Sequence, residues 1–348
     1  MDKAAIQQIK NLLSDKSQKI VIISHVNPDG DAIGSSMGVY HFLKNDNFTH
    51  VSVVSPGSFP SFISWMPGTQ QIIIATREPN KALGALADAD IIFCLDFNDM
   101  ARTDQLQEAL KKSSATKILI DHHPDPHDQF DVVFSHVSAS STAELIYEFI
   151  VALGKEHLLD EHIAQCLYTG IITDTGSFSY ACNNPKTYHI TAHLISLGID
   201  GEKIHRKIYD TYSEDRLRLL GHCLSSNLKV MLPCKTAFIY LSCEDLKRFN
   251  YQEGDTEGVV NYALSIKGIE LGAIFIEKKD IIKISFRSEG TINVNTLARD
   301  YFNGGGHKNA SGGHSQQNLE KTIKDFEQLI ANLSKDDFRT LRVIKDNH

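Results

Sequence analysis

His25, Asp29 and Asp31 share one short stretch, SHVNPDGD at residues 24–31. An apolar run at 20–23, typical of a buried strand, leads directly into this stretch, and its proline and glycine force a turn. Three such groups crowded at a strand end would repel one another or take up protons unless a cation holds them. Carboxylate oxygens with one imidazole suit a divalent ion such as Mn²⁺ or Mg²⁺. The stretch predicts half of a metal site, and the alternative is a polar loop whose Asp31 caps the next helix.

More acidic and histidine residues follow other apolar runs. Asp96 comes after the run 91–95, and the triplet Asp-His-His at 121–123 comes after 117–120. Strands that alternate with helices form a parallel sheet covered on both faces, where ligands bind beyond the carboxyl ends of the strands. A single Asp in this position usually caps a helix. Because capping does not explain several strands that all end in Asp or His, the pattern favours a metal site at this edge.

Two further candidates belong to predicted helices. Asp174 follows a largely apolar helix predicted over 161–173 and stands among small residues, so a bare carboxylate there would need a partner. The alternative for Asp174 is an ordinary surface turn. In the stretch SASSTAE at 138–144, Ser141 and Glu144 have the spacing of a capping box. The exposed N-terminus of that helix would also suit a phosphate group.

A glycine-rich stretch marks the C-terminal part of the chain. Residues 303–314 hold five glycines, which would free the backbone to curl round an anion and present N–H groups to it. The alternative is a flexible loop. His307 within the stretch, and Arg287 at the end of a hairpin predicted over 270–286, favour phosphate binding because each can add a positive charge or a hydrogen bond.

Length and composition set the frame for these motifs. With 348 residues, of which 42% are hydrophobic, the chain can form two domains with substantial cores. The order of strands and helices predicts the α/β class, with a parallel-sheet domain covered by helices on both faces over 1–200. A helical linker is predicted over 201–227, and a smaller α/β domain over 228–348.

Composition also excludes several classes of protein. No apolar run approaches the roughly 20 residues of a membrane span, and the N-terminus lacks the apolar stretch of a signal peptide, so a cytoplasmic location is the default expectation. The six cysteines form no C-x-x-C pair and are expected to be reduced thiols. The net charge of −8 argues against gripping long nucleic acid, which needs a basic surface. A short anionic substrate held by metal and a few basic groups is still compatible with this charge.

Together these motifs resemble the DHH phosphoesterases, a family named for the triplet at 121–123. The resemblance rests on HVNPDGD at 25–31, Asp96, the triplet, TDTG at 173–176, and GGGH at 304–307 with Arg287 upstream. The glycine-rich motif with its arginine marks the C-terminal domain that accompanies one branch of the family. Within that branch, the chain is most similar to two-domain bacterial enzymes that degrade very short RNAs and dephosphorylate 3'-phosphoadenosine 5'-phosphate (pAp).

The resemblance implies two divalent ions, with Mn²⁺ expected and Mg²⁺ or Co²⁺ as alternatives. One ion would be held by His25, Asp29 and Asp96, and the other by Asp31, Asp96, His122 and Asp174, so that Asp96 bridges them. His123 would face the scissile phosphate, and with Asp96 it would carry the catalysis. Substrate contacts would come from Arg102, Arg287, Gly305, Gly306 and His307. The active site would lie in a cleft between the two domains, which would limit the length of the substrate.

The expected function is hydrolysis of oligoribonucleotides of a few residues, and of pAp, by two-metal activation of water. Short RNA or pAp would be the partners, with no membrane and no long nucleic acid. Hydrolysis of linear or cyclic dinucleotide signals is an alternative on the same metal core. Inorganic pyrophosphatase is another, although residues 304–307 depart from that branch. A catalytically silent nucleotide sensor is the third, and the complete ligand set argues against it. The oligomeric state is left open, with a homodimer as one candidate.

Overall fold

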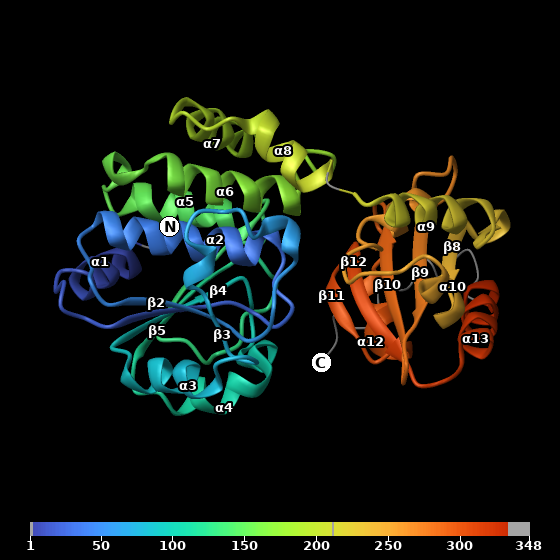
Figure 1. Cartoon of the computed structure of the whole chain (residues 1–348), viewed down its shortest axis with the longest axis horizontal. Coiled ribbons are helices and arrows are strands. Elements are labelled where there is room, and N and C mark those ends of the chain that lie inside the picture. Colours follow the sequence, from blue (N-terminus) through green and yellow to red (C-terminus); the bar gives the residue numbers. More distant parts are fainter. Residues whose placement is uncertain (1–2, 211, 333–348) are drawn as a thin grey trace. The chain divides into compact units, whose positions relative to one another are not determined.

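The computed structural model describes residues 3–210 and 212–332. The chain divides into two compact units, residues 1–211 and 212–348 (Figure 1). Each unit has its own sheet and its own hydrophobic cores. None of the helices in the described ranges is both long enough and apolar enough to cross a membrane.

The first unit is built on a six-stranded sheet in the order β3-β2-β1-β4-β5-β6. Its strands are β1 (Ile20–Ile23), β2 (Val51–Ser55), β3 (Ile73–Ile74), β4 (Ile91–Leu95), β5 (Thr116–Asp121) and β6 (Val132–Ser135). Every pair of neighbouring strands is parallel. The predicted parallel-sheet fold is therefore confirmed. Strands β3 and β6, at the two edges, were not predicted from the sequence.

Helices cover both faces of this sheet, as Figure 1 shows. One face carries α1 (Lys3–Leu12), α2 (Gly30–Asn45), α5 (Thr142–Ala152) and α6 (Glu161–Asp174), and the other carries α3 (Pro79–Asp88) and α4 (Gln107–Lys112). Helices α7 (Pro185–Ser196) and α8 (Gly201–Tyr209) pack on α6. Short 3-10 helices lie at η1 (Ser61–Ile63), η2 (Thr69–Gln71), η3 (Met100–Leu106) and η4 (Glu156–Leu158).

Alternate residues of the strands supply two separate cores. Ile20 and Ile22 of β1 belong to the core under α2, α5 and α6, whereas Val21 and Ile23 belong to the core under α3 and α4. Successive side chains of a strand point to opposite faces of the sheet. A strand that is apolar at every position is therefore buried on both sides, which explains the continuous apolar runs in the sequence.

The strand order places a crevice between the ends of β1 and β4. From β1 the chain adds β2 and β3 on one side, and it then returns to add β4 on the other side. The loops that leave β1 and β4 consequently diverge, and open α/β sheets bind ligands at such a switch point. The stretch 24–31 follows β1 and Asp96 follows β4, so the fold brings the predicted metal residues to this crevice.

Helix α2 packs unusually close to α6. Gly34 and Gly38 of this helix face α6. A Cβ atom at Gly34 would lie only 2.5 Å from the carbonyl oxygen of Cys166. The missing side chain therefore brings the start of α2, with Asp31, near the end of α6, with Asp174.

The second unit contains a mixed six-stranded sheet in the order β11-β12-β10-β9-β8-β7. The strands are β7 (Leu228–Met231), β8 (Thr236–Leu241), β9 (Leu271–Glu277), β10 (Ile282–Ser288), β11 (Gly305–His307) and β12 (Ala310–Ser315). Only β8 and β9 pair in parallel. The helices are α9 (Glu214–Ser225), α10 (Cys243–Arg248), α11 (Val259–Leu264), α12 (Val294–Tyr301) and α13 (Leu319–Asn332), with the 3-10 helix η5 (Leu232–Cys234). Helices α12 and α13 supply one core of this unit, and α9, α10 and α11 supply the other.

The glycine-rich stretch forms a β-hairpin, so the predicted curled loop is wrong. Gly305, Gly306 and His307 form β11, which pairs antiparallel with β12. The glycines permit close approach of the backbone rather than mobility, since a Cβ atom at Gly304 would lie 1.9 Å from the carbonyl oxygen of Gly312.

The segment predicted as a linker, 201–227, is helical in the structure. It contains α8, which packs on α6 and η1 of the first unit, and α9, which packs on α11 and β8 of the second. The division between the units falls between these two helices.

Candidate metal centre

The turn after β1 is shaped by the cap of α2. Asp29 is the N-cap residue, and its Oδ1 accepts hydrogen bonds from the backbone N–H groups of Asp31 and Ala32, both at 3.0 Å. The alternative reading, in which Asp31 is the cap, is therefore wrong. The cap fixes the direction of the Asp29 carboxylate, and Asp31 is left inside the first turn of α2, where its side chain is buried.

Asp96 lies at the centre of the site. Its Oδ2 is 3.4 Å from Nε2 of His25, and its Oδ1 is 3.6 Å from Nε2 of His122. Thr142 at the start of α5 donates a hydrogen bond from Oγ1 to the same Oδ1 at 2.9 Å. The backbone of Asp96 has a φ of +64°, a left-handed conformation that Asp tolerates better than most residues. Nδ1 of His123 lies 3.7 Å from the same Oδ1, so one carboxylate meets three imidazoles from two loops.

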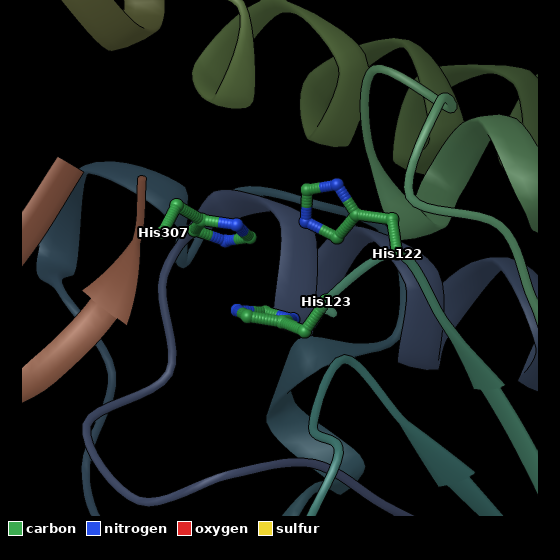
Figure 2. A group of neighbouring side chains, drawn as sticks. All are labelled: His122, His123 and His307. Carbon is green, nitrogen blue, oxygen red and sulfur yellow. The ribbon is translucent and has the colours of Figure 1, made fainter. Parts of the chain in front are cut away.

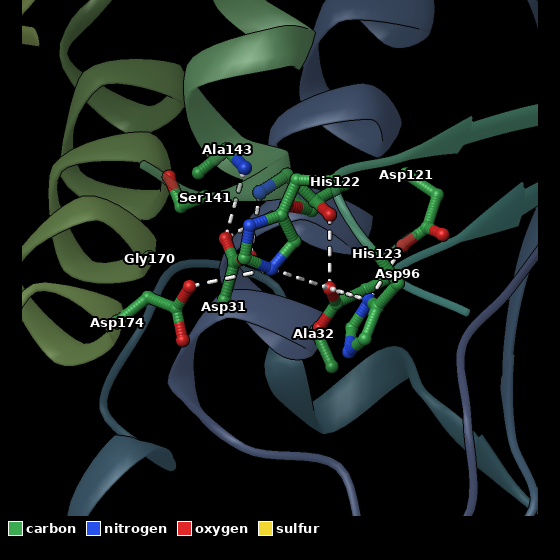
Figure 3. Close-up of polar contacts among 12 residues, drawn as sticks. Asp31, Ala32, Asp96, Asp121, His122, His123, Ser141, Ala143, Gly170 and Asp174 are labelled. Carbon is green, nitrogen blue, oxygen red and sulfur yellow. Dashed lines mark hydrogen bonds and ion pairs between the residues drawn. The ribbon is translucent and has the colours of Figure 1, made fainter. Parts of the chain in front are cut away.

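Three groups of potential metal ligands share Asp96: one joins it to Asp121 and His123, and the other two consist of predicted metal ligands. Of these two, the first contains His25, Asp29 and Asp96, and the second contains Asp31, Asp96 and His122. Within each group the ligand atoms all lie within 4.8 Å of one another. Asp174 joins the second group, because its Oδ2 is 3.3 Å from Nε2 of His122 (Figure 3). The structure thus brings together all six predicted metal residues, from four separate segments of the chain.

The N-terminus of α5 is occupied by the carboxylate of Asp31. Oδ2 of Asp31 accepts the N–H of Thr142 at 2.6 Å, and Oδ1 accepts the N–H of Ala143 at 2.8 Å (Figure 3). Free N–H groups and the positive end of the helix dipole favour an anion at this position. Because that anion is a side chain of the protein itself, the predicted use of this helix start for a substrate phosphate is not available.

The cap of α5 differs in part from the predicted capping box. Ser141 is the N-cap, as predicted, and its Oγ accepts the N–H of Glu144 at 3.1 Å. The Glu144 carboxylate does not return to Ser141. Its Oε2 accepts hydrogen bonds from the Ser140 hydroxyl at 2.6 Å and the Thr187 hydroxyl at 2.7 Å. Glu144 therefore links the loop before α5 to helix α7. The same loop precedes Thr142 and Ala143, whose N–H groups bind Asp31.

His123 is held by a buried carboxylate. Its Nδ1 lies 2.7 Å from Oδ1 of Asp121, the last residue of β5. Asp121 is fully buried, and its Oδ2 has no hydrogen-bond partner within the described residues. Figure 2 shows the ring of His123 beside that of His122, and His307, also labelled there, belongs to β11 of the second unit. The contact of Nδ1 with Asp121 fixes how the imidazole ring of His123 is oriented.

The buried carboxylates of the site are stabilised by nearby positive charge. Burial and the neighbouring charges of Asp96 and Asp174 raise the pKa of Asp31 well above its usual range. Burial alone would raise the pKa of Asp96, but the hydrogen bond from His25 and the nearby histidine charges outweigh it and lower that pKa. Burial disfavours the charged forms of His25 and His122, yet Asp96 beside them raises the pKa of both. Protons on these groups offset the carboxylates, as a cation would.

The donor set fits divalent metal ions. Carboxylate oxygens and imidazole nitrogens from four segments converge, and Asp96 belongs to both ligand groups. Hard oxygen ligands with one imidazole per group suit Mn²⁺, Mg²⁺ or Co²⁺ better than a soft-ligand metal.

The structure places the predicted substrate residues in two sets. Arg102 belongs to η3 of the first unit, where its carbonyl oxygen accepts the N–H of Val26 at 2.7 Å. Its positive charge is one of the smaller influences on the pKa of His25, so it lies near the metal residues. In the second unit, Arg287 of β10 pairs with Ala310 of β12, which pairs in turn with His307 of β11. Paired positions share a face of the sheet, so Arg287 and His307 stand in one row.

Comparisons with known proteins place this chain in a family. The profile of the DHH family, N-terminal domain, matches residues 19–171, and the DHHA1 domain profile matches residues 235–332. These features define a two-domain α/β protein with a carboxylate and histidine centre at the sheet edge. The chain belongs to the DHH family, as the sequence predicted.

Several relatives match along most of their length. The bifunctional oligoribonuclease and PAP phosphatase NrnA of Bacillus subtilis is 30% identical over 319 residues, covering 89% of this chain and 94% of the relative. The probable counterpart of Streptococcus mutans is 30% identical over 317 residues, covering 91% and 95%. A solved structure from Bacteroides fragilis, described as an exopolyphosphatase-related protein, is 44% identical with a TM-score of 0.92, and covers 95% of this chain and 96% of that one.

Sequence reasoning missed two residues of the site. Asp121 was noted as part of the triplet but was given no role, although a carboxylate two residues before His123 is a signal that could have suggested one. Thr142 had no such signal. Its contacts with Asp31 and Asp96 depend on how α5 meets α2 and β4, which lie 111 and 46 residues away along the chain.

Proposed function

We propose that this protein is a metal-dependent phosphoesterase that hydrolyses oligoribonucleotides of a few residues and also pAp. The observation that carries the proposal is the pair of ligand groups that share Asp96, on a chain that matches the curated oligoribonuclease and pAp phosphatase relatives along most of their length. His25, Asp29, Asp31, Asp96, His122 and Asp174 would hold two divalent ions, and Mn²⁺ is the proposed metal. Bound there, the ions would acidify a water and offset charge on the phosphoryl oxygens.

The chain's own residues have distinct tasks in this proposal. Asp96 contributes a carboxylate to both ligand groups and so fixes their spacing. His123, oriented by Asp121, would give a proton from Nε2 to the oxygen that leaves the phosphorus. Arg102, whose backbone carbonyl oxygen accepts the N–H of Val26 next to His25, would bind a non-bridging phosphate oxygen. Arg287, Gly305, Gly306 and His307 would bind the end of the substrate away from the bond that breaks.

The proposal is tested by turnover with Mn²⁺ on four substrates in parallel: pAp, a 5'-labelled RNA dinucleotide, an RNA 24-mer and pyrophosphate. Fast cleavage of pAp and the dinucleotide, with slow cleavage of the 24-mer, is the expected result. A preference for the 24-mer would contradict the short-substrate proposal. Binding of the dinucleotide without any product would favour the nucleotide sensor. A cyclic dinucleotide assayed beside these four tests the signalling alternative, which its cleavage in preference to the linear dinucleotide would favour.

A second candidate function is hydrolysis of inorganic polyphosphate. The structure from Bacteroides fragilis that is 44% identical to this chain is described as exopolyphosphatase-related, and the same metal residues could act on a phosphoanhydride bond. Adding a polyphosphate of about a hundred units to the assay decides between the candidates. A kcat/KM on polyphosphate above that on the dinucleotide would favour this second function.

Two further predictions belong to the protein as a whole. A cytoplasmic location is proposed from the sequence, and a homodimer is one candidate assembly. Size-exclusion chromatography with light scattering measures the mass directly, with 38.8 kDa expected for a single chain.

A further inference from the structure

A loop with several aromatic side chains follows Asp174 directly. Helix α6 ends at Asp174, and α7 begins at Pro185. Phe178 and Tyr180 lie in the connecting loop, and Tyr188 lies in the first part of α7. Asp174 is a candidate metal ligand, and Phe178 and Tyr180 follow it closely in the chain, while Tyr188 is brought to the same loop by its stacking on Phe178. None of the roles proposed above uses them.

The backbone of this loop is fixed in an uncommon conformation. Gly176, Ser177 and Phe178 have consecutive φ angles of +53°, +56° and +63°. The N–H of Ser177 donates to the carbonyl oxygen of Ile172 at 2.7 Å, and the N–H of Tyr180 donates to that of Thr175 at 3.1 Å. The loop is thereby folded back onto the end of α6. Left-handed conformations at residues other than glycine cost free energy and are retained where the surrounding structure enforces them, often at functional sites.

The aromatic rings are held in place yet remain open to solvent. Phe178 and Tyr188 stack with ring centroids 5.6 Å apart and planes 28° apart, and the Tyr188 hydroxyl donates to Sγ of Cys182 at 3.4 Å. The Tyr180 ring covers Gly176, since a Cβ atom at Gly176 would lie 2.3 Å from its Cε1. Even so, 49% of Tyr180 and 48% of Tyr188 is exposed.

Ordered, half-exposed rings on the segment that follows a candidate metal ligand suit one kind of ligand. Burying aromatic surface would stabilise the fold, but these two tyrosines leave about half of theirs in water. Aromatic side chains bind nucleic acid by stacking on successive bases, and such stacking tolerates any base because every base has a π-face. In a nucleotide the base is separated from the phosphate by a single sugar, so a base platform must lie close to the phosphate site.

We infer that Tyr180 and Tyr188, with Phe178 behind Tyr188, form the subsite that stacks on a nucleobase of the substrate. The inference rests on the proposed function and deepens it, because it names the part of the substrate that the metal centre cannot recognise. A subsite of this kind favours nucleotides over pyrophosphate and polyphosphate, which carry no base. It also leaves the base sequence free, since stacking does not read hydrogen-bonding edges.

The test compares two substrates that differ only in their bases. One is the dinucleotide pApA, and the other is the same sugar-phosphate with both bases replaced by hydrogen. Tyr180→Ala and Tyr188→Ala are each expected to raise KM for pApA by about 5- to 150-fold, the range for one lost base stack. Both should lower kcat/KM on the base-free substrate by less than about twofold. Tyr180→Phe and Tyr188→Phe keep the ring and are expected to recover most of the loss.

The matched control is Tyr262→Ala. Tyr262 is a tyrosine of the same exposure, 48%, on α11 of the second unit, and its loss should leave both substrates unaffected. If an alanine variant fails to bind Mn²⁺, a leucine at the same position keeps the apolar bulk without the ring and takes its place. An equal loss on both substrates would show that the loop only supports the metal centre, and this would overturn the inference.

The remaining outcomes separate this inference from the proposed function. If the wild type cleaves pApA but the alanine variants are unaffected, the subsite is refuted while the proposed function stands. If the wild type cleaves polyphosphate and no nucleotide, both are refuted. A wild type that cleaves pApA and its base-free form with equal kcat/KM would also refute the subsite, because bases would then contribute nothing to recognition.

Discussion

At the scale of single residues, the site depends most on Asp96. Its carboxylate is the one group shared by both ligand sets, and it also accepts a hydrogen bond from Thr142. Asp96→Asn removes the negative charge but keeps the size of the side chain. We expect it to lower kcat/KM on pApA by at least about a hundredfold, because changes even to the outer partners of metal ligands cost about 10- to 100-fold. Isothermal titration with Mn²⁺ should show weakened binding in the same variant.

The control for this prediction is Asp88→Asn. Asp88 ends α3 of the same unit, and 73% of its side chain is exposed, so neither activity nor Mn²⁺ binding should change. Full activity in the Asp96 variant would exclude the two-metal arrangement.

We expect substitution of Asp121 to lower kcat without weakening Mn²⁺ binding, whereas substitution of Asp96 weakens that binding. In Asp121→Asn, a neutral amide replaces the carboxylate that faces Nδ1 of His123 at 2.7 Å. Loss of a correctly oriented general acid typically lowers the rate by about 10²- to 10⁴-fold. We therefore expect kcat to fall within this range while Mn²⁺ binds as in the wild type. A variant that also lost Mn²⁺ would indicate that Asp121 supports the metal ligands instead.

At the scale of elements, the N-terminal caps of helices fix where nearby side chains lie. In the second unit, α10 begins with a capping box in which Ser242 and Asp245 each accept the other's backbone N–H. Burial raises the pKa of Asp245, but hydrogen bonds from Ser242 and from His222 outweigh it and lower that pKa. A lowered folded-state pKa contributes stability above the unfolded value near 3.9, and this stability is lost as the pH falls through the folded value.

Asp245→Asn should therefore destabilise the protein at pH 7 by about 1 kcal/mol, the usual contribution of a cap. The difference from the wild type should shrink as the pH falls below about 4, where the unfolded chain takes up the proton. It should vanish once the pH lies below the lowered folded-state pKa of Asp245, where the wild-type carboxyl is neutral as well. Thermal unfolding of both proteins between pH 3 and pH 7 measures this. Glu244→Gln, in the same turn of α10, is the control and should show no comparable loss.

The elements also show what the sequence could and could not predict. Runs such as 20–23 and 91–95 are apolar at every position, so they were recognisable as buried strands, and the residues after them were recognisable as site candidates. β3 has only two residues and carries no periodic signal. The hairpin of β11 and β12 was not predicted, because the glycines were interpreted as freeing the backbone to curl round an anion, whereas here they permit close approach of two strands. The contact of α5 with Asp31 is set by tertiary packing, which no local pattern encodes.

At the scale of the whole molecule, the proposed metal residues all belong to the first unit. Ligands that bind only the folded state stabilise it, by about 2.7 kcal/mol at a hundred times the dissociation constant. Saturating Mn²⁺ should therefore slow amide hydrogen exchange in peptides that follow β1, β4 and β5 and in α5 and α6. Peptides from β9 and β10, in the core of the second unit, should exchange at an unchanged rate. Mass spectrometry with and without EDTA measures both sets, and protection confined to the second unit would contradict the assignment of the metal residues.

The carboxylate of Asp31 at the start of α5 also sets an order of events. In many α/β proteins the N-terminus of a helix binds a phosphate without a metal ion. Here the Asp31 carboxylate occupies the N-terminus of α5, and further carboxylates lie around it. A substrate anion that arrives first meets repulsion, whereas one that arrives after the cations meets attraction. The kinetic mechanism should accordingly be ordered, with metal loading as the first step. Cellular supply of the divalent ion would then govern turnover through the fraction of enzyme that is ready to receive substrate.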